Sequence, residues 1–300
     1  NGADFLYYNS ASEWINVADM VTKEFFKCNA HKLSRAPIQA LIDNNGQLCR
    51  EPFAIINIVT KYYEQLLTAD LVSNQIQECR NQIWSTVKHK VTTEMNNKLE
   101  APILEAKLKV GLWALPKNSC PGEDGFSVVF FQEYWNLIGR WFSKVCNEWF
   151  EKGRMPPSIA AGLIYMIPKG ERQSTNVTKW RPITLLNTVY KIFAKALSLR
   201  LQGFLPQIIH SSQTRFIKER SILDNIFTFW EAIAVAKMGK QDSVILLLDF
   251  EKAYDRVDWA FLEGTMAKMG FSNRWINGVS SLYKGASSKV MAVGGKDPRL

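Results

Sequence analysis

Residues 244–258 read VILLLDFEKAYDRVD. The first five, Val244 to Leu248, form an unbroken apolar run that ends abruptly on the carboxylate of Asp249. A short apolar run followed by charge is typical of a strand that is buried on both faces and ends at a cleft. We therefore predict a strand over 244–248 that holds the Asp249 carboxylate rigidly, a placement suited to binding a divalent cation. The alternative is that these charges are solvated and cap the helix that follows. The rest of the sequence is needed to choose between these two interpretations.

Positive charge is concentrated in one part of the chain. The 300 residues carry 37 Lys and Arg against 28 Asp and Glu, a formal net charge of +9. Residues 140–220 hold 14 basic against 4 acidic residues, whereas residues 1–100 hold 10 against 11. Such a block is the electrostatic footprint of a surface that binds a polyanion. A basic surface that serves only solubility is the alternative.

Size and composition narrow the class of protein. A chain of 300 residues that is 47% hydrophobic can bury a large core, as one big domain or two smaller ones. No run approaches 18 uncharged apolar residues and the N-terminus lacks the features of a signal peptide, so we expect no membrane partner. Five scattered cysteines without a C-x-x-C pattern predict reduced thiols in an intracellular protein rather than disulfides or a zinc site. The missing initiator Met indicates a fragment or a processed product.

A long hairpin is the clearest of the other predicted elements. The segments 162–168 (GLIYMIP) and 180–186 (WRPITLL) read as two strands joined by a polar loop. They place Lys169, Lys179 and Arg181 on one ribbon, where Arg offers a bidentate fork and Lys a point charge to phosphates. An ordinary surface hairpin with Arg181 in a salt bridge is the alternative.

Periodicity and turn residues predict the remaining elements. Helices are expected over 11–30, 51–67, 95–115, 127–152, 187–205, 222–237 and 259–269, with short strands over 38–42 and near the C-terminus. Pro206 is expected to stop the helix over 187–205, and Asp258 to cap the last one. Two segments between helices contain residues that could contact nucleic acid. They are the tight loop 117–126 (KNSCPGEDGF) and a basic cluster around Phe216, made of Arg215, Lys218 and Arg220.

Five stretches, in this order, resemble one family, the reverse transcriptase of non-LTR (LINE-type) retrotransposons of the kind abundant in plants. They are LPKNSCPGEDGFSVVFFQEYW, GLIYMIPK, KWRPITLLNTVYKIFAKALSLRL, LPQIIHSSQTRFIKERSILDN and LLLDFEKAYDRVDW, all between Leu115 and Trp259. The section 20–67 is similar to the segment that precedes that domain. The resemblance implies an α+β fold, with a mainly helical segment over 1–100 and, over 101–300, the fingers and first part of the palm of a right-hand polymerase.

The resemblance also implies roles for single residues. Asp249 matches the first catalytic aspartate, which together with the carbonyl of Phe250 would hold two Mg²⁺ ions. Tyr254 matches the aromatic gate that packs against the nucleotide sugar, and Lys169 and Arg181 match fingers residues at the incoming triphosphate. Together with the basic pattern, the family predicts nucleic-acid contacts by Gly122, Asp124, Gly125, Lys179, Gln213, Arg215, Phe216, Lys218 and Arg220.

The implied partners are an RNA template, a DNA primer and deoxynucleoside triphosphates, in the nucleus and cytoplasm. The sequence departs from the family in lacking any Asp-Asp pair, the mark of the second catalytic motif. Arg215 and Glu219 stand where glycine is common in the family, and Glu123 replaces a common proline. We therefore expect a truncated reverse transcriptase that is inactive as this chain. The alternatives are a non-catalytic nucleic-acid-binding remnant and a pseudogene product.

Overall fold

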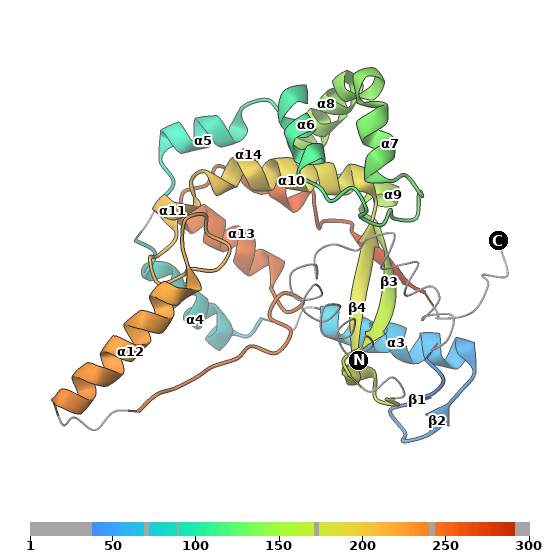
Figure 1. The fold of residues 1–300 in the computed structure, drawn as a ribbon, viewed down its shortest axis with the longest axis horizontal. Coiled ribbons are helices and arrows are strands. Elements are labelled where there is room, and N and C mark those ends of the chain that lie inside the picture. The colour runs from blue at the N-terminus through green and yellow to red at the C-terminus, as the bar shows by residue number, and fades with distance from the viewer. Residues whose placement is uncertain (1–37, 69–71, 89, 171–173, 240–243, 292–300) are drawn as a thin grey trace, which may run out of the picture. The chain divides into compact units, whose positions relative to one another are not determined.

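The structure, a computed structural model, describes residues 38–68, 72–88, 90–170, 174–239 and 244–291 (Figure 1). They form two compact units, one of residues 38–65, 102–196 and 278–291 and the other of residues 66–101 and 197–277. Helices and two small sheets together confirm the α+β class. The helix expected over 11–30 lies outside the described residues. The division into segments 1–100 and 101–300 stays a prediction.

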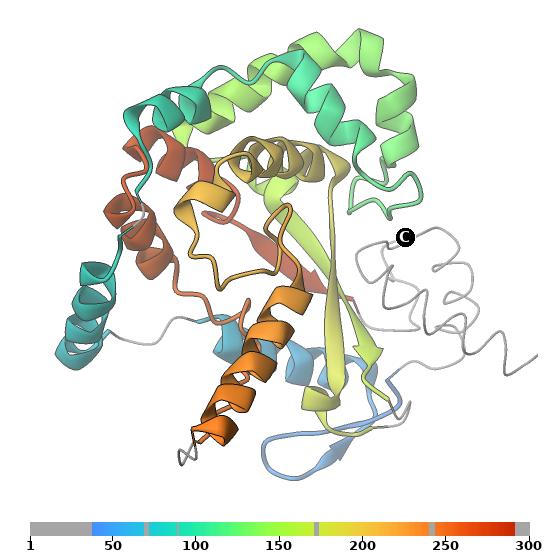
Figure 2. The same cartoon turned by 60° about the vertical axis from the view of Figure 1, so that its left-hand side comes forward.

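The first unit contains the predicted long hairpin. Strands β3 (Ala161–Pro168) and β4 (Trp180–Leu186) pair antiparallel, in a register that runs from Gly162 opposite Leu186 to Pro168 opposite Trp180. Strand β5 (Ser287–Val290) pairs parallel with β3, so the order is β4-β3-β5 (Figures 1 and 2). Burial alternates along β3, as expected for a sheet with one covered face. The strands predicted over 162–168 and 180–186 are confirmed.

Two predicted helices are each split in the structure. The helix expected over 95–115 is α5 (Thr93–Glu100) and α6 (Glu105–Trp113), because Ala101 takes an extended conformation before Pro102. The helix expected over 127–152 is α7 (Val128–Glu133) and α8 (Trp135–Lys152), interrupted at Tyr134. Gly153 ends α8 in the left-handed conformation that glycine adopts without strain. The short α9 (Pro157–Ala160) leads into β3.

Helix α10 (Thr188–Gln202) anchors the core of the first unit. Ile192 and Phe193 are fully buried, and the Phe193 ring meets Trp149 edge-on at 5.8 Å between centroids. The predicted helix was too long at its end: α10 stops at Gln202, and Pro206 lies in the first turn of a separate short helix, α11 (Leu205–Ile208). Proline is tolerated there because that N–H would have no helical partner.

A small hairpin and a helix complete the first unit. Strands β1 (Leu41–Ile42) and β2 (Leu48–Cys49) flank a turn, where Gly46 takes a positive φ of 81°. The Asp43 carboxylate accepts from the N–H groups of Asn45 and Gln47, which closes the turn. Helix α3 (Pro52–Leu67) follows, within a residue of the prediction.

The second unit is helical in its described residues. Besides α5 and α11 it contains α4 (Asn74–Ser85), α12 (Ile222–Met238), α13 (Trp259–Lys268) and the start of α14 (Asn273–Ser280), of which α4 and α14 were not predicted. Trp84 stacks on Phe261 and donates its indole N–H to the Thr265 hydroxyl at 3.0 Å. Asp258 caps α13 as predicted, since its carboxylate accepts from the Phe261 N–H.

The strand predicted over 244–248 is wrong. These residues are irregular and exposed, with Val244 95% and Leu247 84% accessible. A strand needs a partner for its backbone N–H and C=O groups, and no strand within the described ranges pairs with this segment.

Among the described helices, none is both long and apolar enough to span a bilayer.

Candidate functional site

The long hairpin presents three cations to solvent. The Lys169 N–H donates to the Lys179 carbonyl at 2.8 Å, and Ile167 lies opposite Arg181. Lys179 and Arg181 flank the buried Trp180, so both point away from the covered face. Lys169, Lys179 and Arg181 are exposed, and within the described ranges none of them forms an ion pair. The hairpin therefore offers positive charge that the fold leaves available to an anionic ligand.

Residues 174–180 of this hairpin are anchored by hydrogen bonds. The indole N–H of Trp180 donates to the Ser174 carbonyl at 3.0 Å. The short 3₁₀ helix η1 (Val177–Lys179) is capped by Asn176, whose side chain accepts from the Thr178 N–H at 2.9 Å. Because Lys179 ends this turn, its position is set by the cap and by the strand that follows.

The loop 117–126 is held against the start of α10 by buried polar groups. Asn187, 3% exposed, donates to the Ser158 carbonyl and accepts from the Asp124 N–H. The Lys191 ammonium donates to the Ser119 hydroxyl and to the Cys120 carbonyl. The sequence placed Lys191 on the polar face of its helix and gave Asn187 no role, because no local pattern marks a side chain that bonds a loop distant in sequence.

Burial shifts the pKa values around Lys191. Desolvation lowers the pKa of the Lys191 amine, partly offset by the neighbouring Cys120 and Asp124. Desolvation also raises the pKa of the Cys120 thiol to about 11 and raises the pKa of Asp124, where the Phe126 N–H and Lys191 act in the opposite direction. A protonated thiol at neutral pH is not a nucleophile. This cluster therefore shapes the loop and does not supply covalent chemistry.

Each of the three loop residues predicted to touch nucleic acid helps to set the backbone conformation of the loop. The Asp124 carboxylate accepts from the Phe126 N–H at 3.1 Å, and Gly125 takes a φ of 72° that glycine adopts without strain. Gly122 lies so close to α10 that an added Cβ would come 2.2 Å from the Asn187 side-chain oxygen and 2.5 Å from its backbone nitrogen. The tight loop predicted over 117–126 is present; close packing requires glycine at position 122, and the positive φ favours glycine at position 125.

Gly122→Ala is expected to displace this loop and to lower the free energy of unfolding by about 1–3 kcal/mol, the usual effect of overpacking. The clash involves backbone atoms of Asn187 and Leu186, which cannot rotate away. Thermal unfolding monitored by circular dichroism measures the change. Gly170→Ala is the matched control, since a Cβ there meets nothing within 4 Å. An unchanged midpoint for Gly122→Ala would contradict the packing described here.

The basic cluster of the second unit divides into one internal residue and two outward ones. Arg220 donates from its two terminal nitrogens to four carbonyls, those of Pro206, Ile209, His210 and Gln213, at 2.6–2.9 Å. Arg215 instead lies over the Phe216 ring, 5.1 Å from its centroid, and Lys218 is exposed. The Gln213 side chain donates to the Arg215 carbonyl. Arg220 therefore organises the loop from which Arg215, Phe216 and Lys218 project.

The same loop carries local strain at non-glycine residues. Phe216 and Glu219 have φ angles of 64° and 68°, in the left-handed region that glycine favours. The position of Glu219 is one where the resembling family commonly has glycine, and the observed backbone gives a physical reason for that choice. The ion pair between Lys218 and Glu219, 3.7 Å long and exposed, contributes little.

Asp249, Phe250 and Tyr254 lie together in sequence in the second unit, and all are exposed. Phe250 is 76% and Tyr254 80% accessible, so neither ring is packed. No group of three or more His, Cys, Asp or Glu side chains that could hold a metal ion occurs in the described part of the chain. Asp249 alone does not complete a Mg²⁺ site within the described residues, and the binding of Mg²⁺ by Asp249 and the Phe250 carbonyl stays a prediction.

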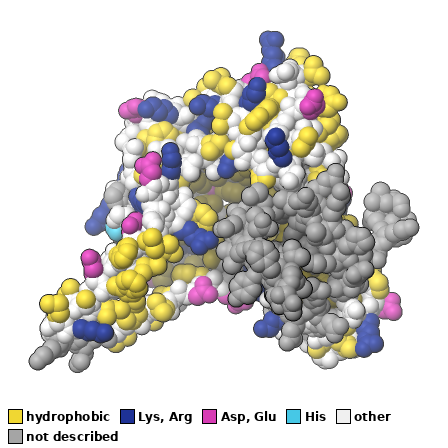
Figure 3. Space-filling model, viewed as in Figure 1, with side chains coloured by type: hydrophobic (Ala, Val, Ile, Leu, Met, Phe, Trp, Pro, Cys, Tyr) yellow, Lys and Arg dark blue, Asp and Glu magenta, His cyan; other side chains and the backbone are white. Residues whose placement is uncertain are grey.

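Apolar side chains of α12, the helix that precedes Asp249 in the sequence, are exposed as well. Helix α12 leaves Phe227 56% and Trp230 60% accessible, and Figure 3 shows hydrophobic side chains gathered over it. The sequence correctly predicted a helix here but not its exposure. An exposed apolar patch of this kind is typical of a surface that another part of the protein or another molecule covers.

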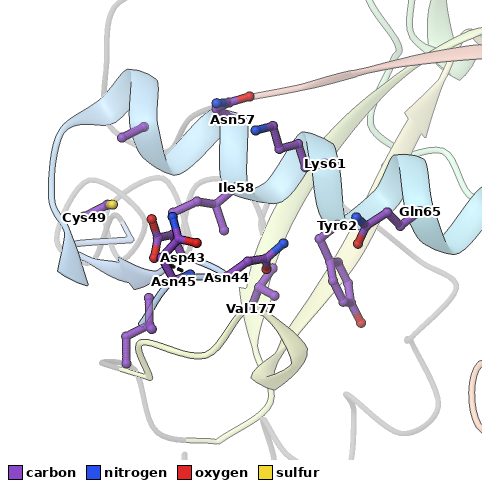
Figure 4. A pocket seen from close by; sticks show the side chains of 12 residues that line it. Asp43, Asn44, Asn45, Cys49, Asn57, Ile58, Lys61, Tyr62, Gln65 and Val177 are labelled. Carbon is purple, nitrogen blue, oxygen red and sulfur yellow. Dashed lines mark hydrogen bonds between the residues drawn. The ribbon is translucent and has the colours of Figure 1, made fainter. Parts of the chain in front are cut away.

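A cavity that the sequence gave no sign of lies in the first unit, between α3 and the β1–β2 hairpin (Figure 4). Its volume is about 430 Å³, within the range of small-molecule sites. Its lining is rich in Asn and Gln side chains. The periodicity of α3 indicated core packing, and only the fold brings the hairpin turn to its exposed stripe.

Comparison with known proteins gives a family match and distant relatives. Residues 167–296 match the family described as reverse transcriptase (RNA-dependent DNA polymerase). The chain is 32% identical, over 91% of its length, to the transposon TX1 uncharacterized 149 kDa protein of Xenopus laevis. It is 22% identical over 72% to a probable RNA-directed DNA polymerase from transposon X-element of Drosophila melanogaster. It is 21% identical over 61% to a retrovirus-related Pol polyprotein from the type-1 retrotransposable element R2 of Popillia japonica.

These similarities confirm the predicted resemblance to reverse transcriptases of non-LTR retrotransposons. The matched residues include β4, the three cations of the long hairpin and Asp249, whereas most of β3 precedes the match. The chain spans 20%, 24% and 25% of the lengths of the three relatives. The plant origin stays a prediction.

Proposed function

We propose that this chain is part of an RNA-directed DNA polymerase of a LINE-type retrotransposon, in which it forms the fingers and the first part of the palm. One observation carries the proposal: the segment that matches the reverse transcriptase family contains the three exposed cations of the long hairpin. Lys169 and Arg181 contact the incoming deoxynucleoside triphosphate, and Lys179 contacts the nucleic-acid backbone. The RNA template and DNA primer are its macromolecular partners, in the nucleus and cytoplasm.

The remaining site residues have proposed roles in the same reaction. Asp249 supplies a metal-binding carboxylate with the Phe250 carbonyl, and Tyr254 packs against the nucleotide sugar. Gly122, Asp124 and Gly125 contact the template, as do Gln213, Arg215, Phe216 and Lys218. We assign Arg220 to loop structure rather than to direct contact, because its donors are bonded to backbone carbonyls.

Metal chemistry requires more ligands than the described residues bring together. Polymerases of this class use hard divalent cations held by several carboxylate oxygens. Asp249 provides one such group, and no cluster of three ligand-type side chains occurs in the ranges that the structure describes. We therefore expect that DNA synthesis requires carboxylates outside the described residues.

A second function is favoured by the exposed cations alone. A non-catalytic remnant that binds RNA or DNA through the long hairpin needs no metal site. Its affinity would come from phosphate neutralisation and would fall steeply with salt. Nucleic-acid binding is thus common to both functions, and DNA synthesis separates them.

Replacing Lys169, Lys179 and Arg181 together by alanine is expected to reduce the salt dependence of single-stranded RNA binding. Each phosphate contact contributes a slope of about −0.7 to the plot of log affinity against log salt concentration, so the slope should become less steep by about 2. Fluorescence anisotropy over a salt series measures it. The control removes Lys107, Arg140 and Lys144, exposed cations of the same unit with the same total charge. Equal slopes for both variants would refute the role of the hairpin.

A further inference from the structure

The cavity beside α3 has two walls of different origin. One stripe of α3 forms the first, since its residues recur at the three- and four-residue spacing of a helix face. The hairpin turn, β2 and the first residue of η1 form the other (Figure 4). The lining side chains that carry the argument are Asp43, Asn44, Asn57, Lys61, Tyr62 and Gln65.

The walls are fixed by hydrogen bonds and by the core behind them. The Ile42 N–H donates to the Thr175 carbonyl at 2.9 Å, which ties the hairpin to the segment that leads into η1. The Asp43 carboxylate accepts from two backbone N–H groups, one of which is drawn in Figure 4. On the opposite face of α3, Val59 and Tyr63 are buried. A ligand would therefore meet a cavity that is already formed, which lowers the entropy lost on binding.

The polar lining matches the edge of a nucleobase. Side-chain amides both donate and accept, as the Watson–Crick and Hoogsteen edges of bases do, and Asn or Gln pairs with adenine in a bidentate manner. Four amides line this cavity, those of Asn44, Asn45, Asn57 and Gln65. In the described part of the chain none of these amides has a hydrogen-bond partner. The Asp43 carboxylate adds an acceptor for an exocyclic amino group.

Two further side chains fit the rest of a nucleotide. The Tyr62 ring forms part of the wall, and aromatic side chains beside polar groups are the usual platform for unpaired bases. Lys61 lies one helical turn from Asn57 and supplies a positive charge for a phosphate. Val177 at the rim begins the turn that ends at Lys179, one of the cations of the long hairpin.

We propose that this cavity binds a nucleobase together with its phosphate. The amides read the base edge, Tyr62 contacts its face and Lys61 contacts the phosphate. The base comes from a single-stranded nucleic acid whose backbone is held by the long hairpin, and in this one respect the proposal rests on the proposed function. A free nucleotide offers the same chemistry, so the experiment separates the two sources.

Cys49 is a reporter inside the cavity, because its half-buried thiol belongs to the lining. Cys79 in α4 is exposed and serves as the internal control. The alkylation rate of each thiol by iodoacetamide is measured by peptide mass spectrometry with a short oligo(A) RNA, an abasic oligonucleotide of equal length, or AMP. We expect oligo(A) to slow Cys49 by at least about fivefold, the lower end for one stacked base, and to leave Cys79 unchanged.

Each outcome decides the proposal. Slowing of Cys49 by AMP but not by oligo(A) upholds the nucleobase site and identifies a free nucleotide as the source. Equal slowing by the abasic strand overturns the proposal, since phosphates alone would then shield the thiol. Absence of slowing by every probe overturns it as well.

Variants separate this site from the polymerase proposal. Asn57→Ala with Gln65→Ala should abolish the protection of Cys49, whereas Asn136→Ala, which removes an exposed amide from α8, should preserve it. RNA binding with an unprotected Cys49 in the unaltered chain would defeat the cavity proposal alone. Protection by AMP in a chain that does not bind RNA would defeat the polymerase proposal alone.

Discussion

Asp249→Asn is expected to reduce RNA-templated DNA synthesis by at least about 100-fold in the proposed polymerase that contains this chain. This is the loss that removal of one preorganised electrostatic group causes, and a metal-binding carboxylate is a stronger case. Binding of RNA should be nearly unchanged, because Asp249 carries a negative charge that does not contact phosphates without a metal. Primer extension on a primed RNA template measures synthesis, and anisotropy measures binding.

The matched control is Glu231→Gln, which removes the same charge from an exposed position of α12 in the same unit. It should retain synthesis and binding. Full activity of Asp249→Asn would show that the metal-binding carboxylates are elsewhere. A parallel loss of RNA binding would show that the substitution disturbs the fold, which an exposed Asp249 gives no reason to expect.

Features with a local cause could be predicted from the sequence. The long hairpin follows from two apolar runs and a polar tip, Gly153 from the end of an amphipathic pattern, and Asp258 from its place before a helix. The exposed cations of the hairpin follow from the same pattern, because the sheet leaves one face uncovered. Splitting of the helix expected over 95–115 was also within reach, since Pro102 disfavours a helical residue before it.

Features that depend on distant partners could not be predicted. An apolar run such as 244–248 has the pattern of a buried strand, yet it is a strand only where another strand pairs with it. The role of Lys191 depends on a loop some 70 positions earlier, and the cavity beside α3 depends on a hairpin turn and η1 meeting one helix stripe. Sequence pattern specifies the face of an element, whereas its partner is set by the tertiary fold.

Arg220 shows that residues of one basic cluster in the sequence can make different contacts in the fold. Arg215, Lys218 and Arg220 form one basic cluster in sequence, which indicates phosphate binding for all three. The guanidinium of Arg220 is instead surrounded by the carbonyls of Pro206, Ile209, His210 and Gln213. Its planar fork suits this role, because two nitrogens can each donate to two acceptors at fixed angles. Arg215 lies on an exposed ring and keeps its charge available.

This difference predicts opposite effects for two substitutions of the same residue type. Arg220→Ala is expected to lower the free energy of unfolding by about 2–4 kcal/mol, because a charged donor is worth about 1.5–3 kcal/mol and several carbonyls lose it at once. Urea denaturation followed by circular dichroism measures this change. Arg215→Ala should alter stability by less than about 1 kcal/mol, the value of an exposed cation–π contact. It should instead make the salt dependence of RNA binding less steep by about 0.7. If Arg220→Ala were as stable as the unaltered protein and shifted the salt dependence, Arg220 would be a phosphate ligand after all, and the loop would be held by its other contacts.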